Sequence, residues 1–190
     1  MQADGGVIAY QSYKDGNWEI YVTADVTGAP RRLTADPSSD IEPSLSVDMT
    51  RVVFTSRRAG NYDLFSLGVD GTGLRQLTDS AATDSAAVWS PDGTRIAFQS
   101  NRGGNYDVYV MNADGSGLTQ LTTSADYDGE PTWSPDGAQI AFVSRRSNTV
   151  SDFFIYVMNA DGGGQRLVAA VPNSANPAWS YNGRRILFDG

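Results

Sequence analysis

The sequence predicts an all-β fold made of repeated four-stranded units. A short apolar motif, seen at residues 96–100, recurs at a period of 44 residues. Residues 52–95 and 96–139 are identical at 22 of 44 aligned positions. No stretch shows a sustained 3.6-residue apolar period, so helices are not expected. Four short strands in a period of about 40 to 50 residues are typical of a β-propeller blade. The predicted fold class is therefore a β-propeller with about four to four and a half repeats in the chain.

The repeats cover almost the whole chain. Each unit is too small to bury both of its faces alone, so neighbouring units must stack around a common axis. An N-terminal tail is expected at residues 1–6, followed by a β-propeller array at 7–190. Within the array we place the repeats at residues 8–51, 52–95, 96–139 and 140–185, with a partial copy at 186–190.

The third copy shows the first three expected strands most clearly. Residues 96–100 are apolar on both faces, as stacking between two blades requires. After a turn at 102–105, residues 106–111 are rich in aromatic and β-branched side chains, which favour strands. A glycine-containing turn at 113–117 leads to the third strand at 118–122, because Gly supplies the positive φ of a tight turn.

The fourth strand of each copy carries a tryptophan. In the third copy it spans residues 131–134 and ends in a Pro-Asp-Gly turn at 135–137, where Pro fixes φ and Gly accepts the left-handed position. Trp89, Trp133 and Trp179 recur at this place. Because a central strand packs between blades, we interpret them as core residues rather than as a set that stacks on sugars.

Net charge and the length of the apolar runs argue against two classes of partner. Fourteen basic and 22 acidic side chains give a net charge of −8, so the basic surface that phosphate backbones attract is missing and no nucleic-acid binding is expected. No apolar run approaches the roughly 18 residues of a membrane span, so membrane insertion is not expected either. Residues 1–6 lack the charged and apolar regions of a signal peptide.

Missing residue types argue against most enzyme chemistry. The chain has no His, which excludes Ser-His-Asp triads and histidine metal sites. It has no Cys, which excludes thiolate nucleophiles, zinc clusters and disulfides. Lys14 is the single lysine, which argues against Schiff-base chemistry. We expect a protein that is not an enzyme and that needs no cofactor.

The sharpest functional candidate is a recurring acidic position. Asp40, Asp84 and Asp128 each lie in the loop that enters the tryptophan strand or its equivalent. If these loops open at a channel mouth, three carboxylates converge and could hold a cation such as calcium, or receive basic groups of a partner. The third loop is the most acidic, because it also carries Asp126 and Glu130. The alternative that we favour is that each Asp accepts hydrogen bonds from backbone amides of its own loop.

A second recurring set pairs a base with an acid across the turn that follows the first apolar strand, at residues 102–105 in the third copy. Such pairs could form a recognition surface for charged peptides. We favour local ion pairs that hold the hairpin, which contribute about 0–1 kcal/mol each when exposed. The expected pairs are Lys14 with Glu19, Arg58 with Asp63, and Arg102 with Asp107.

The repeat resembles a known family. Residues 89–98 read Trp-Ser-Pro-Asp-Gly-Thr-Arg-Ile-Ala-Phe, residues 105–115 read Asn-Tyr-Asp-Val-Tyr-Val-Met-Asn-Ala-Asp-Gly, and Trp-Ser-Pro-Asp-Gly returns at 133–137. These motifs are similar to the WD-repeat-like propeller repeat of the TolB family, which has relatives on prolyl-oligopeptidase-type and tricorn-type peptidases. The resemblance spans essentially the whole chain. It implies that the tryptophan strand is innermost and the Leu-Thr strand outermost, and that the protein is periplasmic or exported.

These observations together predict a binding protein. We expect a non-catalytic scaffold that binds a protein or peptide partner at the channel mouth and on its loop faces. Three alternatives stay open: an accessory or gating propeller of a peptidase, a cation- or sugar-binding module, and an amplified or designed repeat with no evolved ligand. The repeat identifies the fold much more clearly than it identifies the function.

Counting strands predicts a homo-oligomer. If the tryptophan strand counts as the first strand of a blade and the Ile-Ala-Phe strand as the second, as the resemblance implies, the chain starts with a second strand at residues 8–12. It ends with an inner tryptophan strand at 177–180 and another second strand at 186–189. A four-bladed monomer could close by pairing 177–180 with 8–12, but 186–189 would then be surplus. Because open sheet edges and apolar faces favour association, we expect two or more chains to complete a larger ring through a composite blade.

Overall fold

The computed structural model describes residues 6–14, 16–24, 28–146 and 152–190. All regular elements in this part of the chain are strands, so the predicted all-β fold is confirmed. Since these residues form no helix, none of them belongs to a helix that could cross a membrane.

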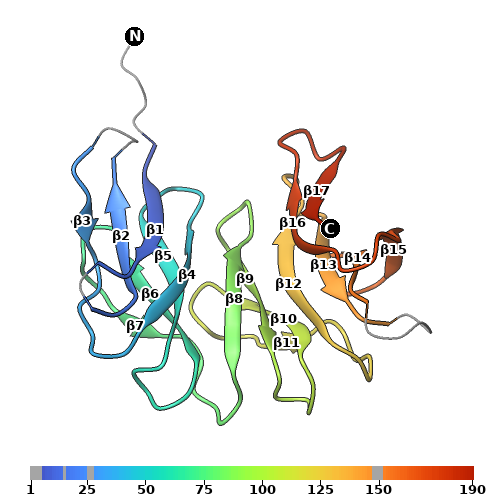
Figure 1. Ribbon diagram of the computed structural model, residues 1–190, viewed down its shortest axis with the longest axis horizontal. Coiled ribbons are helices and arrows are strands. Elements are labelled where there is room, and N and C mark those ends of the chain that lie inside the picture. The colour runs from blue at the N-terminus through green and yellow to red at the C-terminus, as the bar shows by residue number, and fades with distance from the viewer. Residues whose placement is uncertain (1–5, 15, 25–27, 147–151) are drawn as a thin grey trace.

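The strands form antiparallel sheets that follow one another along the chain from one side of Figure 1 to the other. The first sheet contains β1 (Ile8–Ser12), β2 (Glu19–Thr23) and β3 (Arg31–Arg32). The second contains β4 (Asp40–Leu45), β5 (Arg51–Ser56), β6 (Asp63–Gly68) and β7 (Arg75–Gln76). The third contains β8 (Asp84–Trp89), β9 (Arg95–Ser100), β10 (Asp107–Asn112) and β11 (Thr119–Gln120). The fourth contains β12 (Asp128–Trp133), β13 (Gln139–Ser144), β14 (Phe154–Asn159) and β15 (Arg166–Ala169), and the last contains β16 (Ala175–Trp179) and β17 (Ile186–Asp189).

The order of strands within each sheet agrees with the family resemblance. In the second, third and fourth sheets the strands are hydrogen-bonded in chain order, starting with β4, β8 or β12. These starting strands contact one another from sheet to sheet, and β12 also contacts β16. The strands that carry the tryptophan or its equivalent therefore form the inner side of the row, and the short Leu-Thr strands form the outer side.

Every inner strand contains a β-bulge at the same place. On β12 the pairing with β13 shifts between Gly129 and Thr132, so one extra residue is inserted. The residue inside the bulge has a left-handed backbone although it is not glycine, which is an uncommon conformation for other residues. The four bulge residues are Glu42 (φ 54°), Ala86 (52°), Glu130 (51°) and Asn176 (51°).

The hydrophobic cores lie between successive sheets. Ala97 and Val108 of the third sheet pack against Trp133 and Phe142 of the fourth. Full burial of a side chain such as Phe142 contributes about 1.5–3 kcal/mol, which is why neither face of a blade is stable in water. Trp89 packs on the equivalent core between the second and third sheets. The interpretation of these two tryptophans as core residues between blades is confirmed.

Trp179 occupies the same place in the last sheet but is only half-buried. Its Nε1–H donates a hydrogen bond of 3.2 Å to the carbonyl oxygen of Thr132 on the neighbouring inner strand. This tryptophan thus also joins two successive sheets.

The row of sheets does not close through hydrogen-bonded strands in the part of the chain that is described. β16 pairs with β17, and β1 pairs with β2. The first and last sheets share no strand pair and stand on opposite sides of Figure 1. The four-bladed monomeric ring, in which the inner strand of the last sheet would pair with β1, is therefore not formed.

Candidate functional site

The recurring aspartates are the first residues of the inner strands and are fully buried. Asp84 shows the arrangement: its Oδ2 lies 2.8 Å from Nη2 of Arg102, and its Oδ1 lies 2.9 Å from the same nitrogen. Arg102 follows the second strand of the same sheet. The equivalent ion pairs are Arg58 with Asp40 (2.6 Å) and Arg146 with Asp128.

Each of these arginines is also held by aromatic rings. The Arg102 guanidinium lies 5.7 Å from the ring centroid of Phe98 and 5.1 Å from that of Tyr109, and its Nε–H donates to Ser100 Oγ at 2.9 Å. The carboxylate, the guanidinium and the two rings thus connect the first three strands of one sheet. Because breaking such a buried pair leaves an unpaired charge, the cluster is a strong structural requirement.

The three aspartates are not brought together. Among the described residues there is no group of three acidic side chains placed to hold a metal ion. A cation at Asp40, Asp84 or Asp128 would also have to displace a guanidinium from the same carboxylate. Burial raises the pKa of Asp40, while Ser56 and Arg58 act in the opposite direction. The main partner of each aspartate is an arginine. The favoured alternative, in which each aspartate accepts hydrogen bonds from backbone amides of its own loop, is therefore corrected as well.

The predicted ion pairs across the hairpins β1–β2, β5–β6 and β9–β10 are wrong. Ser56 at the end of β5 is paired with Asp40 on one side and with Asp63 on the other, so the following Arg58 lies between two carboxylates. It binds Asp40, which the chain places 18 residues away, and not Asp63. Asp63 instead accepts a hydrogen bond of 3.2 Å from Thr78 Oγ1.

The other two predicted pairs change in related ways. Asp107 accepts a hydrogen bond of 3.0 Å from the Thr122 hydroxyl. Glu19 forms an ion pair of 2.7 Å with Arg32, and the Lys14 ammonium lies 4.2 Å from the ring centroid of Tyr21. Strand pairing, rather than separation along the chain, decides which acid each base meets.

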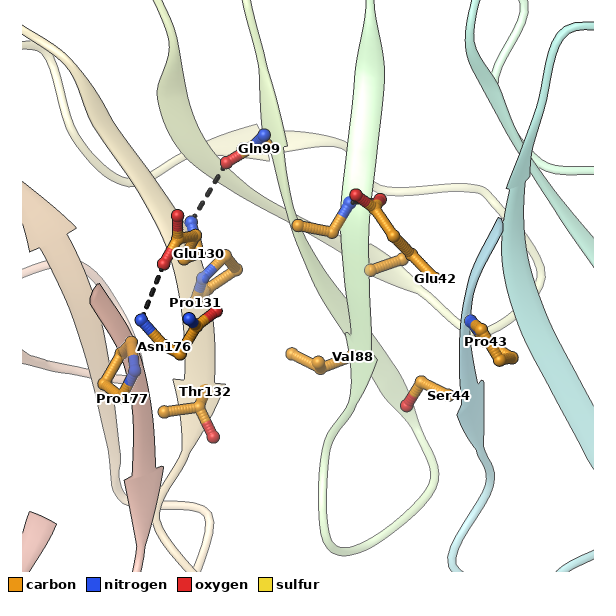
Figure 2. A pocket seen from close by; sticks show the side chains of 12 residues that line it. Glu42, Pro43, Ser44, Val88, Gln99, Glu130, Pro131, Thr132, Asn176 and Pro177 are labelled. Carbon is orange, nitrogen blue, oxygen red and sulfur yellow. Dashed lines mark hydrogen bonds between the residues drawn. The ribbon is translucent and has the colours of Figure 1, made fainter. Parts of the chain in front are cut away.

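A hollow of about 430 Å³ opens between the inner strands (Figure 2). Glu42 and Glu130 are the only charged side chains among the described residues that line it. Glu42 is exposed and Glu130 is half-buried. The lining is Glu42, Pro43, Ser44, Ala86, Ala87, Val88, Gln99, Glu130, Pro131, Thr132, Asn176 and Pro177, from β4, β8, β9, β12 and β16.

The bulges set the wall of this hollow. The left-handed turn of each bulge points a backbone N–H at the preceding sheet, where a side chain accepts it. The N–H of Glu130 donates to Gln99 Oε1 at 3.0 Å, and the N–H of Asn176 donates to Glu130 Oε2 at 2.8 Å, as the dashed lines of Figure 2 show. In the same way the N–H of Ala86 donates to Glu42 Oε2 at 2.8 Å.

Tyr127 holds the acceptor of the third sheet in place. Its hydroxyl donates to Gln99 Oε1 at 2.9 Å, and Gln99 Nε2 donates to Ser85 Oγ at 2.9 Å. Burial, together with the nearby charge of Glu130, raises the pKa of Tyr127 well above its ordinary value, so the hydroxyl remains a donor. Gly129 leaves room for this contact, because a Cβ there would collide with Gln99 and Tyr127.

Two of the predicted acidic residues of the third loop therefore have different places. Glu130 lines the hollow. Asp126 is exposed in the loop before β12, where its carbonyl oxygen accepts from Asn105 Nδ2 at 2.6 Å. Sequence reasoning missed Glu42, although it stands 88 residues before Glu130, at the same place two repeats earlier. The signal was masked because the intervening copy has Ala86 there.

Comparison with known proteins shows the family to which this architecture belongs. The family model described as the tricorn protease N-terminal β-propeller domain matches residues 59–189. The chain belongs to this family. No curated protein matches the chain at a significant level. The tricorn protease structure itself is similar to this propeller with a TM-score of 0.60 at 13% identity, over 82% of this chain and 17% of that chain, which shows the fold alone.

TolB structures are also similar to this tricorn-type propeller. TolB from Agrobacterium tumefaciens has a TM-score of 0.84 and 26% identity, over 98% of this chain and 72% of that chain. TolB from Acinetobacter baumannii has a TM-score of 0.81 and 27% identity, over 95% of this chain and 45% of that chain. The propeller repeat and its resemblance to the TolB and tricorn types are confirmed.

Proposed function

We propose that this propeller is a non-catalytic scaffold that binds a protein or peptide partner through the hollow between its inner strands. The observation that carries the proposal is the pair of carboxylates, Glu42 and Glu130, on the wall of an open hollow that contains no basic side chain among its described lining residues. The adjoining loop faces extend the surface available to a partner.

The chemistry of the wall favours a cationic group on the partner. One carboxylate oxygen of Glu130 is bound to the N–H of Asn176, which fixes the side chain and leaves the other oxygen for a ligand. Glu42 is fixed in the same way by the N–H of Ala86. A hydrogen bond to a charged group contributes about 1.5–3 kcal/mol, so arginine or lysine side chains of a peptide fit this wall best.

The proposal of a non-enzyme rests on residue types. Without His or Cys, the chain has no conventional nucleophile–base pair for peptide or ester cleavage. Hydrolysis of peptide or ester substrates by the purified chain would contradict this part of the proposal.

A second candidate is an accessory propeller that gates access to a peptidase domain. The family match favours it, because the matching family is named for the N-terminal propeller of a protease. Both candidate functions use the hollow between the inner strands. They differ in whether the hollow only binds a partner or also controls access to a peptidase domain. We further propose a periplasmic or exported location, which the similarity to two TolB structures supports.

The test is binding of a labelled pentapeptide that contains two arginines, followed by fluorescence anisotropy at 0.15 M salt. Replacing both wall carboxylates, Glu42→Gln with Glu130→Gln, should weaken binding about tenfold or more, since each 1.4 kcal/mol is a factor of ten. The matched control, Asp114→Asn with Asp161→Asn, removes the same charge from exposed outer turns and should change affinity less than about twofold.

Three results would overturn the proposal. These are equal weakening in both double variants, equal binding of a pentapeptide with two glutamates, and the absence of peptide binding at millimolar concentration. Calorimetry with calcium chloride tests the cation-binding alternative: heat that disappears in Glu42→Gln with Glu130→Gln would replace the peptide by a metal ion as the ligand.

A further inference from the structure

Two of the contacts between successive sheets bring an aspartate of one sheet close to the first residue of the next inner strand. Between the second and third sheets, Asp63 begins β6 and Asp84 begins β8, and the backbone N–H of Asp84 donates a hydrogen bond of 2.8 Å to the carbonyl oxygen of Tyr62. Asp107 of β10 and Asp128 of β12 repeat this arrangement between the third and fourth sheets. We call these two contacts the second and third joints.

The outer aspartate of each of these joints has no basic partner. Asp63 is 1% exposed and Asp107 is 2% exposed, and neither forms an ion pair with a basic residue in the described part of the chain. The arginines that follow the neighbouring strands β5 and β9, Arg58 and Arg102, bind the inner aspartate of their own sheet instead. Because burying an unpaired carboxylate is costly, both joints favour an aspartate that carries a proton.

The other two joints are built differently. At the first joint, between the first and second sheets, Glu19 is buried but forms an ion pair of 2.7 Å with Arg32, while Asp40 has its own arginine. At the last joint, between the fourth and last sheets, Phe154 and Ser174 stand in place of the two acids. The same fold therefore accepts a joint in which each acid has a base, and a joint in which neither acid is present.

A glutamine stands in place of the missing base in the second and third joints. The strand pairings put Gln76 and Gln120 where Arg32 stands in the first sheet. Gln120 Nε2 donates to Asp107 Oδ2 at 2.9 Å, and Gln76 Nε2 donates to Asp63 Oδ2 at 3.4 Å. An amide can also turn and offer its carbonyl oxygen to a protonated carboxyl group, whereas a guanidinium can only donate. The glutamine therefore suits both forms of the acid.

The surroundings of Asp63 favour its protonated form. Burial raises the pKa of Asp63 above its ordinary value, and the charges of Asp84 and Asp79 act in the same direction. The hydroxyl of Thr78 and the backbone of Ser80 act in the opposite direction. Since the pKa is raised in the folded state, the stability that protonation provides is present at low pH and is lost as the pH rises through the folded pKa.

Asp107 has equivalent surroundings. Burial raises the pKa of Asp107, and Asp128 acts in the same direction, while Thr122, the glutamine and the charge of Arg146 oppose it. Tyr109 lies on the same strand, and burial together with the charge of Asp107 raises its pKa as well, so it remains neutral. The third joint should therefore respond to pH with the same sign as the second.

We propose that protons bound to Asp63 and Asp107 keep the second and third joints closed, and that these joints loosen when the protons are released. In the closed state the proton lies on Oδ2 and is donated to the carbonyl oxygen of the glutamine. The strands β8 and β12 begin at these joints and carry the bulges at Ala86 and Glu130, so loosening moves the wall of the hollow. The proposal does not depend on which ligand the hollow binds.

Hydrogen exchange followed by NMR measures each joint through the backbone hydrogen bond that crosses it. The N–H groups of Asp84 and Asp128 donate to the preceding sheet at 2.8 Å, and that of Ser174 donates to Phe153 at 3.0 Å. From pH 4 to pH 8, after correction for the intrinsic pH dependence of exchange, the protection of the Asp84 and Asp128 amides should fall about tenfold. The protection of the Ser174 amide should change less than about twofold.

Replacing both outer aspartates by neutral side chains tests the role of the proton. Asp63→Asn with Asp107→Asn keeps an acceptor for the threonine hydroxyls. Because this variant has no proton to release, its melting temperature should exceed that of the unmodified protein by about 3 °C at pH 8 and by less than about 1 °C at pH 4. The matched control, Asp114→Asn with Asp161→Asn, removes the same charge from exposed turns and should not gain stability at pH 8.

A second double variant supplies the missing base. Gln76→Arg with Gln120→Arg gives both joints the ion pair that Glu19 forms with Arg32, so the protection of their amides should no longer fall between pH 4 and pH 8. Equal pH dependence of exchange at the second, third and last joints of the unmodified protein would overturn the proposal. Melting temperatures of the asparagine variant and the unmodified protein that change in parallel from pH 4 to pH 8 would also overturn it.

Discussion

Asp128 and Glu130 stand two residues apart on β12 but have different surroundings and different roles. Asp128 is fully buried and forms an ion pair with Arg146 inside its own sheet. Glu130 lines the hollow and binds the backbone of the next sheet. In a regular strand, residues i and i+2 point to the same face. The bulge at Glu130 breaks this rule, because its left-handed backbone turns the side chain out of the sheet.

The contrast between these two positions separates architecture from function in this repeat. The aspartate recurs unchanged at 40, 84 and 128 because each sheet needs the same carboxylate for its arginine. The bulge position instead reads Glu42, Ala86, Glu130 and Asn176. A position that the fold keeps open, and at which the copies differ, is where a binding surface can be built.

The largest expected effect comes from removing a buried aspartate. Asp84→Ala leaves the Arg102 guanidinium beside two rings without its carboxylate, so we expect a loss of about 3 kcal/mol in the free energy of unfolding. Guanidinium denaturation at pH 7 measures it. Glu130→Gln keeps an acceptor for Asn176 and should cost less than about 0.5 kcal/mol. Equal losses in the two variants would contradict the division between the two acidic series.

A smaller loss of stability is expected from a substitution at Gly129, the residue between Asp128 and Glu130. Gly129→Ala adds a methyl group that collides with Gln99 and Tyr127, and we expect a loss of about 1–2 kcal/mol in unfolding free energy. The reverse change at the equivalent position of the last sheet, Ala175→Gly, is the matched control and should cost about 0.5–1 kcal/mol by backbone entropy alone. If Gly129→Ala were neutral in thermal melts, the contact between Tyr127 and Gln99 would not hold the wall in place.

The smallest expected effect is a difference in pH dependence between the turn residue Asp92 and the buried Asp40. Hydrogen bonds from Ser90 and Thr94 lower the pKa of Asp92 to about 2, below its value in the unfolded chain. This contribution is present above pH ~4 and is lost as the pH falls toward 2. Burial raises the pKa of Asp40, which gives the opposite sign, with stability lost as the pH rises through the folded pKa.

Asp92→Asn tests the first half of this contrast. Asn182 fills the same place in the last hairpin, where its Oδ1 accepts from Ser180 and Arg184, so the turn should remain intact. The melting temperature of the variant should fall less than that of the unmodified protein between pH 5 and pH 2. Parallel curves would show that the turn hydrogen bonds do not favour the charged form of Asp92.

Much of the fold was predictable from the sequence, while only part of the candidate site was. The 44-residue period and the core role of Trp133 follow from patterns that repeat in register, and the strand order is what the family resemblance implies. Glu130 was singled out for its charge, but Glu42 was not, because Ala86 interrupts the series. The partner of Arg58 was mistaken, since a strand pairing places two acids on either side of it.

Hydrophobic burial between blades and tight turns leave a repeating local signal, which is enough to predict that the chain is built of stacked four-stranded sheets. Which acids are neutralised and which face the hollow depends on how the strands pair and stack in three dimensions. Arg58 reaches Asp40, which stands 18 residues earlier in the chain, because β4 and β5 pair side by side. The bulge is one extra residue with a left-handed backbone. No local sequence motif predicts it, since Glu, Ala, Glu and Asn occupy this position in the four sheets. Long-range pairing sets both features, and it exists only once the sheets have formed.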